Sequence, residues 1–281
     1  MTVLGAGHGP SMLEAVVLSF HEFQFLLQKL ELTNIPVVLA ANRYYDTEDT
    51  YSQAMSGAEQ SLTDRELLFG EEVLPDLAER LRALERPHWA LEMRWIVADS
   101  VNRLCIAKGD ELEVVVLRGQ NSFVVDEVGP DLPGTVIAAL GSAPPLELYG
   151  MNAPTEELAP ILGDTGDTAA TARRLAEIGR PAQDAQTLAA ALVEIESAAE
   201  IIGVVYGDGS RDFTPNHISV FNTRHGRFIS TTSVSEDEVK WSSLSTGTPA
   251  RLRIALQDLI NSMPLREDFP FGSGSASPLG T

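Results

Sequence analysis

The side chains that could carry out chemistry are spread along this sequence and do not share a recognised catalytic spacing. Its five histidines lie in unrelated contexts, and none is paired with another at a spacing typical of metal ligands: His8, His21, His88, His217 and His225. A lone histidine is far more often a surface or packing residue than a ligand or a base. The pattern therefore predicts no metal site, no cofactor and no catalytic residue.

Short motifs with a known mechanism are missing too. The sequence has no G-x-S-x-G, H-E-x-x-H, P-loop or C-x-x-C spacing. No motif therefore supports a hydrolase, a metalloprotease, a nucleotide-binding protein or a zinc protein. Asp208, Ser210 and Asp212 have the first three spacings of a calcium loop, but Ser219 stands where that loop needs a glutamate. We interpret this segment as a hairpin loop.

An enzyme stays open as an alternative, with a site in the groove between two halves of the chain. Its working groups would be Asp208, Asp212 or His217. Such an enzyme would have a deep polar pocket holding a carboxylate or a histidine with a perturbed pKa. A binding protein would instead present a broad, shallow and mostly apolar surface.

Net charge excludes two classes of partner. The chain has 40 acidic and 20 basic residues and a net charge of -20, whereas nucleic acid and anionic lipid require clustered positive charge. The acidic excess is concentrated in residues 46–92, which we interpret as solvated helical faces. The single cysteine, Cys105, lies in the apolar run RLCIAK, which predicts a buried, unreactive thiol in a reducing compartment.

The N-terminus and the hydrophobic runs indicate a cytoplasmic protein. Residues 1–11 have neither a basic region nor an apolar run of signal-peptide length, and no apolar stretch approaches the length of a membrane span. We expect no membrane insertion. At 281 residues with 44% hydrophobic content, the chain can bury a large core.

The clearest structural pattern is in residues 218–264, which predict three strands followed by a helix. In the helix, apolar residues recur with spacings of three and one and line one face: Leu252, Ala255, Leu256, Leu259, Ile260 and Met263. Thr248 is the expected N-cap, with Pro249 in the first turn and Pro264 after the last apolar residue. We expect this helix to pack on a sheet, and Gly226 to adopt a positive φ in a turn.

A weaker copy of this order occurs earlier in the chain. Residues 93–97, 103–107, 112–117 and 122–128 read as strands before a short helix, and residues 200–206, 217–222, 226–232 and 239–244 read as strands before the last helix. The expected class is α+β, with a mixed, mainly antiparallel central sheet, helices packed on it, and two pseudo-symmetric α/β halves.

The organisation follows from these elements. We expect a flexible tail at residues 1–11, an N-terminal α/β half at 12–150, a C-terminal half with a helical bundle at 151–268, and a second flexible tail at 269–281. Residues 168–178 and 182–196 read as a helical hairpin, with Gly179 closing the first helix and Pro181 opening the second. Such a hairpin can serve as core packing or as a binding surface.

Two regions together resemble the EspG family of ESX (type VII) secretion-associated proteins. In the C-terminal half these are HISVFNTRHGRFISTT and KWSSLSTGTPARLRIALQDLINSMP. In the N-terminal half, LEAVVLSFHEFQFLLQKLELTNIPVVLA is similar to the family's opening strand, helix and short strand, and ALEMRW to its entry into the central sheet. The resemblance spans residues 13–264 and rests on the order of many weak matches.

This resemblance implies a non-enzymatic cytosolic chaperone that binds the PPE subunit of PE/PPE heterodimers and directs them to secretion. It also implies possible contact with ESX membrane machinery. The implied partner-binding residues come from an expected loop at 97–103, the strand after residue 240 and the helical hairpin: Val97, Ser100, Val101, Asn102, Arg103, Trp241, Ser243, Leu244, Thr246, Leu175 and Leu188. The short 97–103 segment and the heavy acidic block depart from the family pattern.

Within the strand after residue 240, alternation places Val239, Trp241 and Ser243 on one face and Lys240, Ser242 and Leu244 on the other. Trp241 could be a core residue or an interface hot spot, and core is the more frequent role. Small polar residues beside it leave the backbone accessible, which suits docking.

A third alternative is a structural protein that forms a homodimer through a sheet edge.

Overall fold

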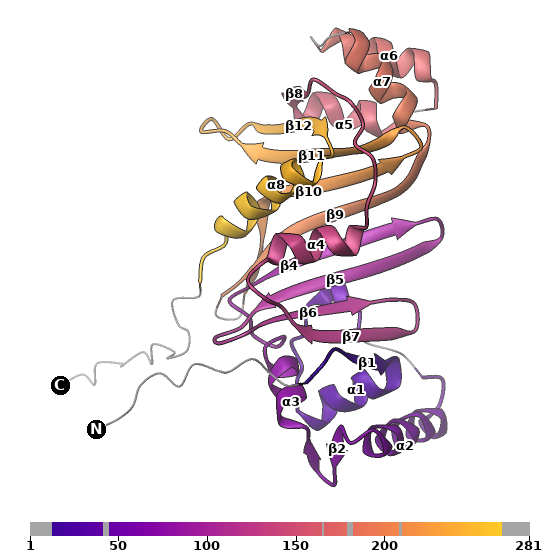
Figure 1. Cartoon of the computed structure of the whole chain (residues 1–281), viewed down its shortest axis with the longest axis vertical. Coiled ribbons are helices and arrows are strands. Elements are labelled where there is room, and N and C mark those ends of the chain that lie inside the picture. Colours follow the sequence, from indigo (N-terminus) through magenta and orange to yellow (C-terminus); the bar gives the residue numbers. More distant parts are fainter. Residues whose placement is uncertain (1–12, 42–44, 165, 179–181, 208–209, 266–281) are drawn as a thin grey trace, which may run out of the picture.

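The computed structural model describes residues 13–41, 45–164, 166–178, 182–207 and 210–265. Within them the chain forms a ten-stranded sheet in the order β1-β7-β6-β5-β4-β9-β10-β11-β12-β8 (Figure 1). Its strands are β1 (Val16–Ser19), β4 (Trp89–Val97), β5 (Ser100–Lys108), β6 (Glu113–Arg118), β7 (Ser122–Glu127), β8 (Met151–Pro154), β9 (Ile195–Tyr206), β10 (Arg211–Thr223), β11 (Gly226–Val234) and β12 (Lys240–Thr246). Among the described residues the ladders are antiparallel, and the isolated bridge between Pro145 and Arg227 is parallel. The predicted α+β class is confirmed.

The strand order repeats about the middle of the sheet. There β4 pairs with β9, and the strands follow outwards as β5, β6, β7 and β1 on one side and as β10, β11, β12 and β8 on the other. Each half starts with its edge strand, continues with helices, and then forms a four-stranded meander that ends in a helix. The predicted pseudo-symmetry of the two halves is therefore confirmed, while the exact boundary near residue 150 stays a prediction.

The helices occupy three places around the sheet. They are α1 (Phe20–Lys29), α2 (Glu48–Asp64), α3 (Pro75–Arg82), α4 (Leu132–Leu140), α5 (Thr155–Gly163), α6 (Thr168–Glu177), α7 (Ala182–Leu192) and α8 (Pro249–Asn261), with a 3₁₀ helix η1 (Val37–Leu39) and a small hairpin of β2 (Leu68–Phe69) and β3 (Glu72–Val73). Figure 1 shows α4 and α8 across the middle of the sheet, α1–α3 at one end and α5–α7 at the other.

Alternation along the strands assigns each helix group to a face of the sheet. Leu104 and Ile201 pack under α4 and α8, and we call this side the α4–α8 face. Cys105 packs with α1–α3, and Phe228 packs with α5–α7. The strand register puts Cys105 and Phe228 on the same side, the opposite face. This face is thus covered by helices at its two ends.

Helix α8 begins and packs as its sequence predicts. The side chain of Thr248 accepts a hydrogen bond from the backbone N–H of Arg251 at 3.2 Å, and Pro249 is the first helical residue. Leu252, Leu256 and Leu259 are buried against the sheet and α4, since the apolar stripe of an amphipathic helix stabilises only when it is removed from water.

Arg227, at the start of β11, joins this half to the chain that arrives from α4. Its side chain is 2% exposed and donates to the carbonyl oxygens of Leu140 and Gly141 at 3.1 and 2.9 Å, and to Asn222 Oδ1 at 2.6 Å. The preceding Gly226 has φ 132°, and a Cβ there would lie 2.7 Å from the backbone nitrogen of Leu146. The positive φ predicted for Gly226 is confirmed. Arg227 therefore holds the end of α4 against the C-terminal meander.

Four predictions of local structure are wrong. Residues 37–39 form η1 and not a strand. The second helix of the hairpin ends at Leu192 and not at residue 196, because Ile195 already pairs with Thr223 in the sheet. Residues 97–103 are not a loop, since Val97 pairs with Ser100 across a two-residue turn. Finally, β10 begins at Arg211, six residues before the predicted strand at residue 217. The segment with Ser210 and Asp212, which we interpreted as a hairpin loop, therefore lies partly within β10.

Some predicted features lie outside the described residues, namely both tails, Gly179, Pro181 and Asp208. Elsewhere the buried thiol is confirmed, because Cys105 is fully buried and burial raises its pKa well above the usual range, with Glu92 adding to the effect. In the described part of the chain, no helix is both long and apolar enough to cross a membrane.

Candidate partner-binding surfaces

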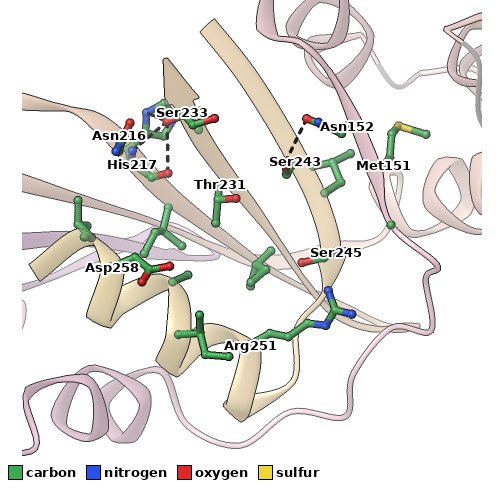
Figure 2. Close-up of a pocket in the computed structure, with 18 residues that line it drawn as sticks. Met151, Asn152, Asn216, His217, Thr231, Ser233, Ser243, Ser245, Arg251 and Asp258 are labelled. Carbon is green, nitrogen blue, oxygen red and sulfur yellow. Dashed lines mark hydrogen bonds between the residues drawn. The ribbon is translucent and has the colours of Figure 1, made fainter. Parts of the chain in front are cut away.

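A groove of about 830 Å³ runs between α8 and the last strands of the sheet on the α4–α8 face. Figure 2 shows Thr231, Ser243 and Ser245 on its floor, with Arg251 and Asp258 on the α8 side and Asn152 on the far side. The groove exists because α8 covers β9 and β10 and leaves this face of β11 and β12 open. We call it the α8 groove.

Short hydroxyl side chains make the floor of the α8 groove polar and shallow. The Ser243 hydroxyl donates to Asn152 Oδ1 at 3.1 Å, which ties β12 to the edge strand β8. Ile254 forms part of the α8 wall and is 61% exposed. This mixture of hydroxyls, one exposed apolar residue and two opposite charges is suited to holding an extended polypeptide segment.

A second surface lies on the opposite face, in the middle of the sheet between the two helix groups. Its residues come from β4, β5 and β9, and we call them the central band: Arg94, Ile96, Val101, Arg103, Ala198 and Glu200. Arg94, Ile96 and Glu200 are exposed although they lie on central strands, and Ile96 is 45% exposed. Exposed apolar area in the centre of a sheet is unusual and marks interaction surfaces.

The strand register arranges the central band in two rows across the sheet. Val101, Ile96 and Ala198 lie opposite one another and form an apolar row, which continues to the half-buried Phe221 on β10. Phe221 stacks on Phe228 with ring centroids 4.7 Å apart, at the edge of the α5–α7 core. The apolar row thus runs from the middle of the sheet to the base of the helical bundle.

The second row of the central band carries charge. Arg103, Arg94 and Glu200 lie opposite one another on β5, β4 and β9, next to the apolar row. Burial and the neighbouring charge of Arg94 lower the pKa of Arg103. A partner docking here would therefore meet an apolar strip bordered by arginines.

Glu92, which we expected on a solvated helical face, is instead buried on β4. Its side chain is 5% exposed, and the buried atom Oε1 has no hydrogen-bond partner. Burial raises the pKa of Glu92 to about 7, although the charge of Arg211 acts to lower it. The prediction failed here because net charge along a segment does not show which acids fall on a strand.

We expect Glu92 to make the protein less stable as the pH rises from about 4.5 to 7. In this window the folded protein holds a proton on Glu92 that the unfolded chain releases, so raising the pH favours unfolding by up to about 3 kcal/mol. Glu92→Gln should be more stable than the wild type at pH 8 and equally stable at pH 4.5. Urea unfolding at both pH values measures this, with Glu200→Gln, an exposed neighbour on the same face, as the control. An equal difference at both pH values would contradict the prediction.

The residues predicted to bind a partner do not form one site. Val101 and Arg103 point to the opposite face, whereas Val97, Ser100 and Asn102 point to the α4–α8 face. Trp241 and Ser243 lie on the α4–α8 face, with Trp241 half-buried and three strands, β9, β10 and β11, between them and β4. Thr246 is on the opposite face, at the far end of β12 from Trp241.

Three of the predicted contact residues are inside the core. Leu175, Leu188 and Leu244 are at most 1% exposed and pack together where α6 and α7 meet β12. They can position a binding surface but cannot contact a partner in this conformation. Ile96 and Arg94 were missed, although the alternation in ALEMRW places Glu92 and Arg94 on the face away from Leu91, Met93 and Trp95.

Asp212 and His217, the two groups of the alternative enzyme that the structure describes, do not converge either. His217 lines the α8 groove on β10 and accepts or donates a hydrogen bond with Thr232 Oγ1 at 2.9 Å. Burial and the charge of Lys240 lower its pKa, while Glu200 opposes them. Asp212 is an exposed residue near the start of β10. In the described residues no group of three acidic, histidine or cysteine side chains could hold a metal ion.

Comparison with known proteins gives three findings. A model described as the EspG family matches residues 19–258. No curated protein matches the chain. Among solved structures, the fold is similar to that of the Mycobacterium tuberculosis type VII secretion system chaperone EspG5, solved in complex with the PE25-PPE41 dimer. That match has a TM-score of 0.74 and 14% sequence identity, and it covers 89% of this chain and 97% of the other.

Proposed function

The chain belongs to the EspG family, and from this premise we propose that it is a cytosolic chaperone of a type VII secretion system. Its partner is a PE/PPE heterodimer, bound through the PPE subunit, kept soluble and delivered to the ESX membrane machinery. The observation that carries this proposal is the family match over residues 19–258, supported by the shared fold with a chaperone solved on such a dimer. The proposed activity is binding without catalysis.

We place the partner contact on the central band, with the base of the α5–α7 bundle beside it. From β5 to β10 the apolar row crosses four strands, about 15 Å at the usual strand spacing. A single helix has a diameter of about 10 Å, so the row can accept one end of a helical bundle. Covering an apolar tip of that kind would keep the dimer from aggregating without any use of ATP.

Co-expression tests this function. The protein, produced with candidate PE/PPE pairs and captured by affinity, should elute in size exclusion as a one-to-one-to-one complex whose mass is confirmed by light scattering. An interface of standard size, roughly 1,600 Å² in total, is sufficient for such a complex. Failure to bind any pair encoded next to its own gene would contradict the proposal. Light scattering of the free protein decides the homodimer alternative, because a strict monomer excludes it.

A further inference from the structure

Three arginines lie next to one another across the opposite face. Arg94, Arg103 and Arg118 are register partners on β4, β5 and β6, and like charges placed directly opposite destabilise a sheet. Arg118 lies over the ring of Phe20, with Cζ 4.8 Å from the ring centroid. Among the described residues Arg94 and Arg103 form no ion pair. Glu200 on β9 is the register partner of Arg94 on its other side, so the row carries three positive charges and one negative charge.

Two of these arginines line a pocket of about 290 Å³, which we call the arginine pocket. A third cation, Arg211, enters it from β10, and Arg211 also makes no ion pair with the described residues. The remaining walls are largely apolar and include Val37 of η1, Ile202 of β9 and Phe213 of β10. The pocket therefore combines three guanidinium groups and the carboxyl groups of Glu92 and Glu200 with an apolar lining.

The buried carboxyl of Glu92 forms the polar end of the arginine pocket. Oε1 is enclosed and unpartnered, which is rare for a buried polar atom and calls for an explanation such as a missing ligand. The titratable groups around Glu92 are Arg94 on its own strand, Arg103 and Cys105 on β5, Glu200 and Tyr206 on β9, and Arg211 on β10. Tyr206 is also left with a buried, unpartnered hydroxyl.

We propose that the arginine pocket binds a small organic anion, a carboxylate or phosphate group on an apolar body, and that Glu92 takes up a proton when the anion binds. Guanidinium groups bind carboxylate and phosphate oxygens with paired, charge-assisted hydrogen bonds. A second negative charge beside Glu92 disfavours its ionised form, and a protonated Glu92 can donate a hydrogen bond that the carboxylate cannot. The pocket shares Arg94, Arg103 and Glu200 with the central band, but the proposed binding of an anion does not depend on the proposed chaperone function.

Calorimetric titration of the full-length protein at pH 8 tests the site with three probes: phenyl phosphate, benzoate and inorganic phosphate. We expect phenyl phosphate or benzoate to bind, and the tighter of the two identifies the preferred anionic group. Inorganic phosphate should bind more weakly, because it has no apolar body. Arg103→Gln should weaken binding at least tenfold, about 1.4 kcal/mol. That variant also removes a like-charge contact, so it should fold. Arg173→Gln, an exposed arginine on α6, is the control and should bind like the wild type.

Proton uptake separates this proposal from general attraction to positive charge. At pH 8 both organic probes are fully ionised, so titrations in two buffers with different ionisation enthalpies should show proton uptake by the wild type and none by Glu92→Gln, which should still bind the probe. The proposal is overturned if no probe binds at 10 mM, if Arg103→Gln binds like the wild type, or if proton uptake persists in Glu92→Gln. None of these outcomes bears on whether the protein binds a PE/PPE dimer.

Discussion

Arg227→Ala is expected to lower the free energy of unfolding by about 4 kcal/mol. The substitution removes a buried cation that donates to Asn222, Leu140 and Gly141, and it leaves these acceptors in a dry site. Hydrogen bonds from a charged group contribute about 1.5 to 3 kcal/mol each, although their losses do not add fully. In a chain of this size the melting temperature should fall by roughly 10 °C.

Arg224→Ala is the matched control for Arg227→Ala. Arg224 lies three residues earlier, is 76% exposed and pairs with Glu194 at 3.4 Å. An exposed ion pair contributes less than about 1 kcal/mol, so this variant should melt close to the wild type. Equal melting temperatures for the two variants would show that Arg227 does not hold the end of α4 against the meander.

Ile96→Asp is expected to weaken binding of the PE/PPE dimer at least a hundredfold without unfolding the protein. The substitution places a charge in the middle of the apolar row, where docking would strip it of water, and a desolvated unpaired charge opposes binding strongly. Because Ile96 is already 45% exposed, stability should change little. Titration of the purified dimer into each variant measures the affinity, and circular dichroism checks the fold.

Ile254→Asp provides a control of the same chemistry on the other side of the sheet. Ile254 is an exposed isoleucine on α8, in the wall of the α8 groove. We expect this variant to bind the dimer normally. If Ile254→Asp abolishes binding and Ile96→Asp does not, the partner occupies the α8 groove, and Trp241 and Ser243 become the residues to test next.

The meanders and α8 could be predicted because their patterns are local. Alternation in residues 89–97 and the 3.6-residue period of α8 are properties of single elements. Strand β8 was missed because it has only four residues and ends in Pro154, which gives too short a pattern to distinguish from a connection. Residues 37–39 were assigned to a strand from the family resemblance, but three apolar residues fit a 3₁₀ turn equally well.

The candidate site could be predicted only in part, because it depends on contacts between the halves. The sequence shows that Glu92 and Arg94 share a face, but only the pairing of β4 with β9 and β5 brings Arg103 and Glu200 beside them. It is likewise the placement of α1–α3 and α5–α7 at the two ends of the opposite face that leaves Ile96 uncovered. No local sequence pattern determines how much of the sheet is covered by helices from distant segments of the chain.

The pairing of β4 with β9 also sets the order in which the chain can fold during its synthesis. The first half has all its strands once β7 ends at Glu127, but β4 keeps an open edge until β9 ends at Tyr206, about 80 residues later. At the usual 5 to 20 residues per second of translation, this delay is roughly 4 to 16 seconds. During that interval the nascent chain exposes the unpaired edge of β4, the nine residues Trp89–Val97. The protein is therefore most exposed to aggregation while its first half is complete and β9 has not yet been synthesised.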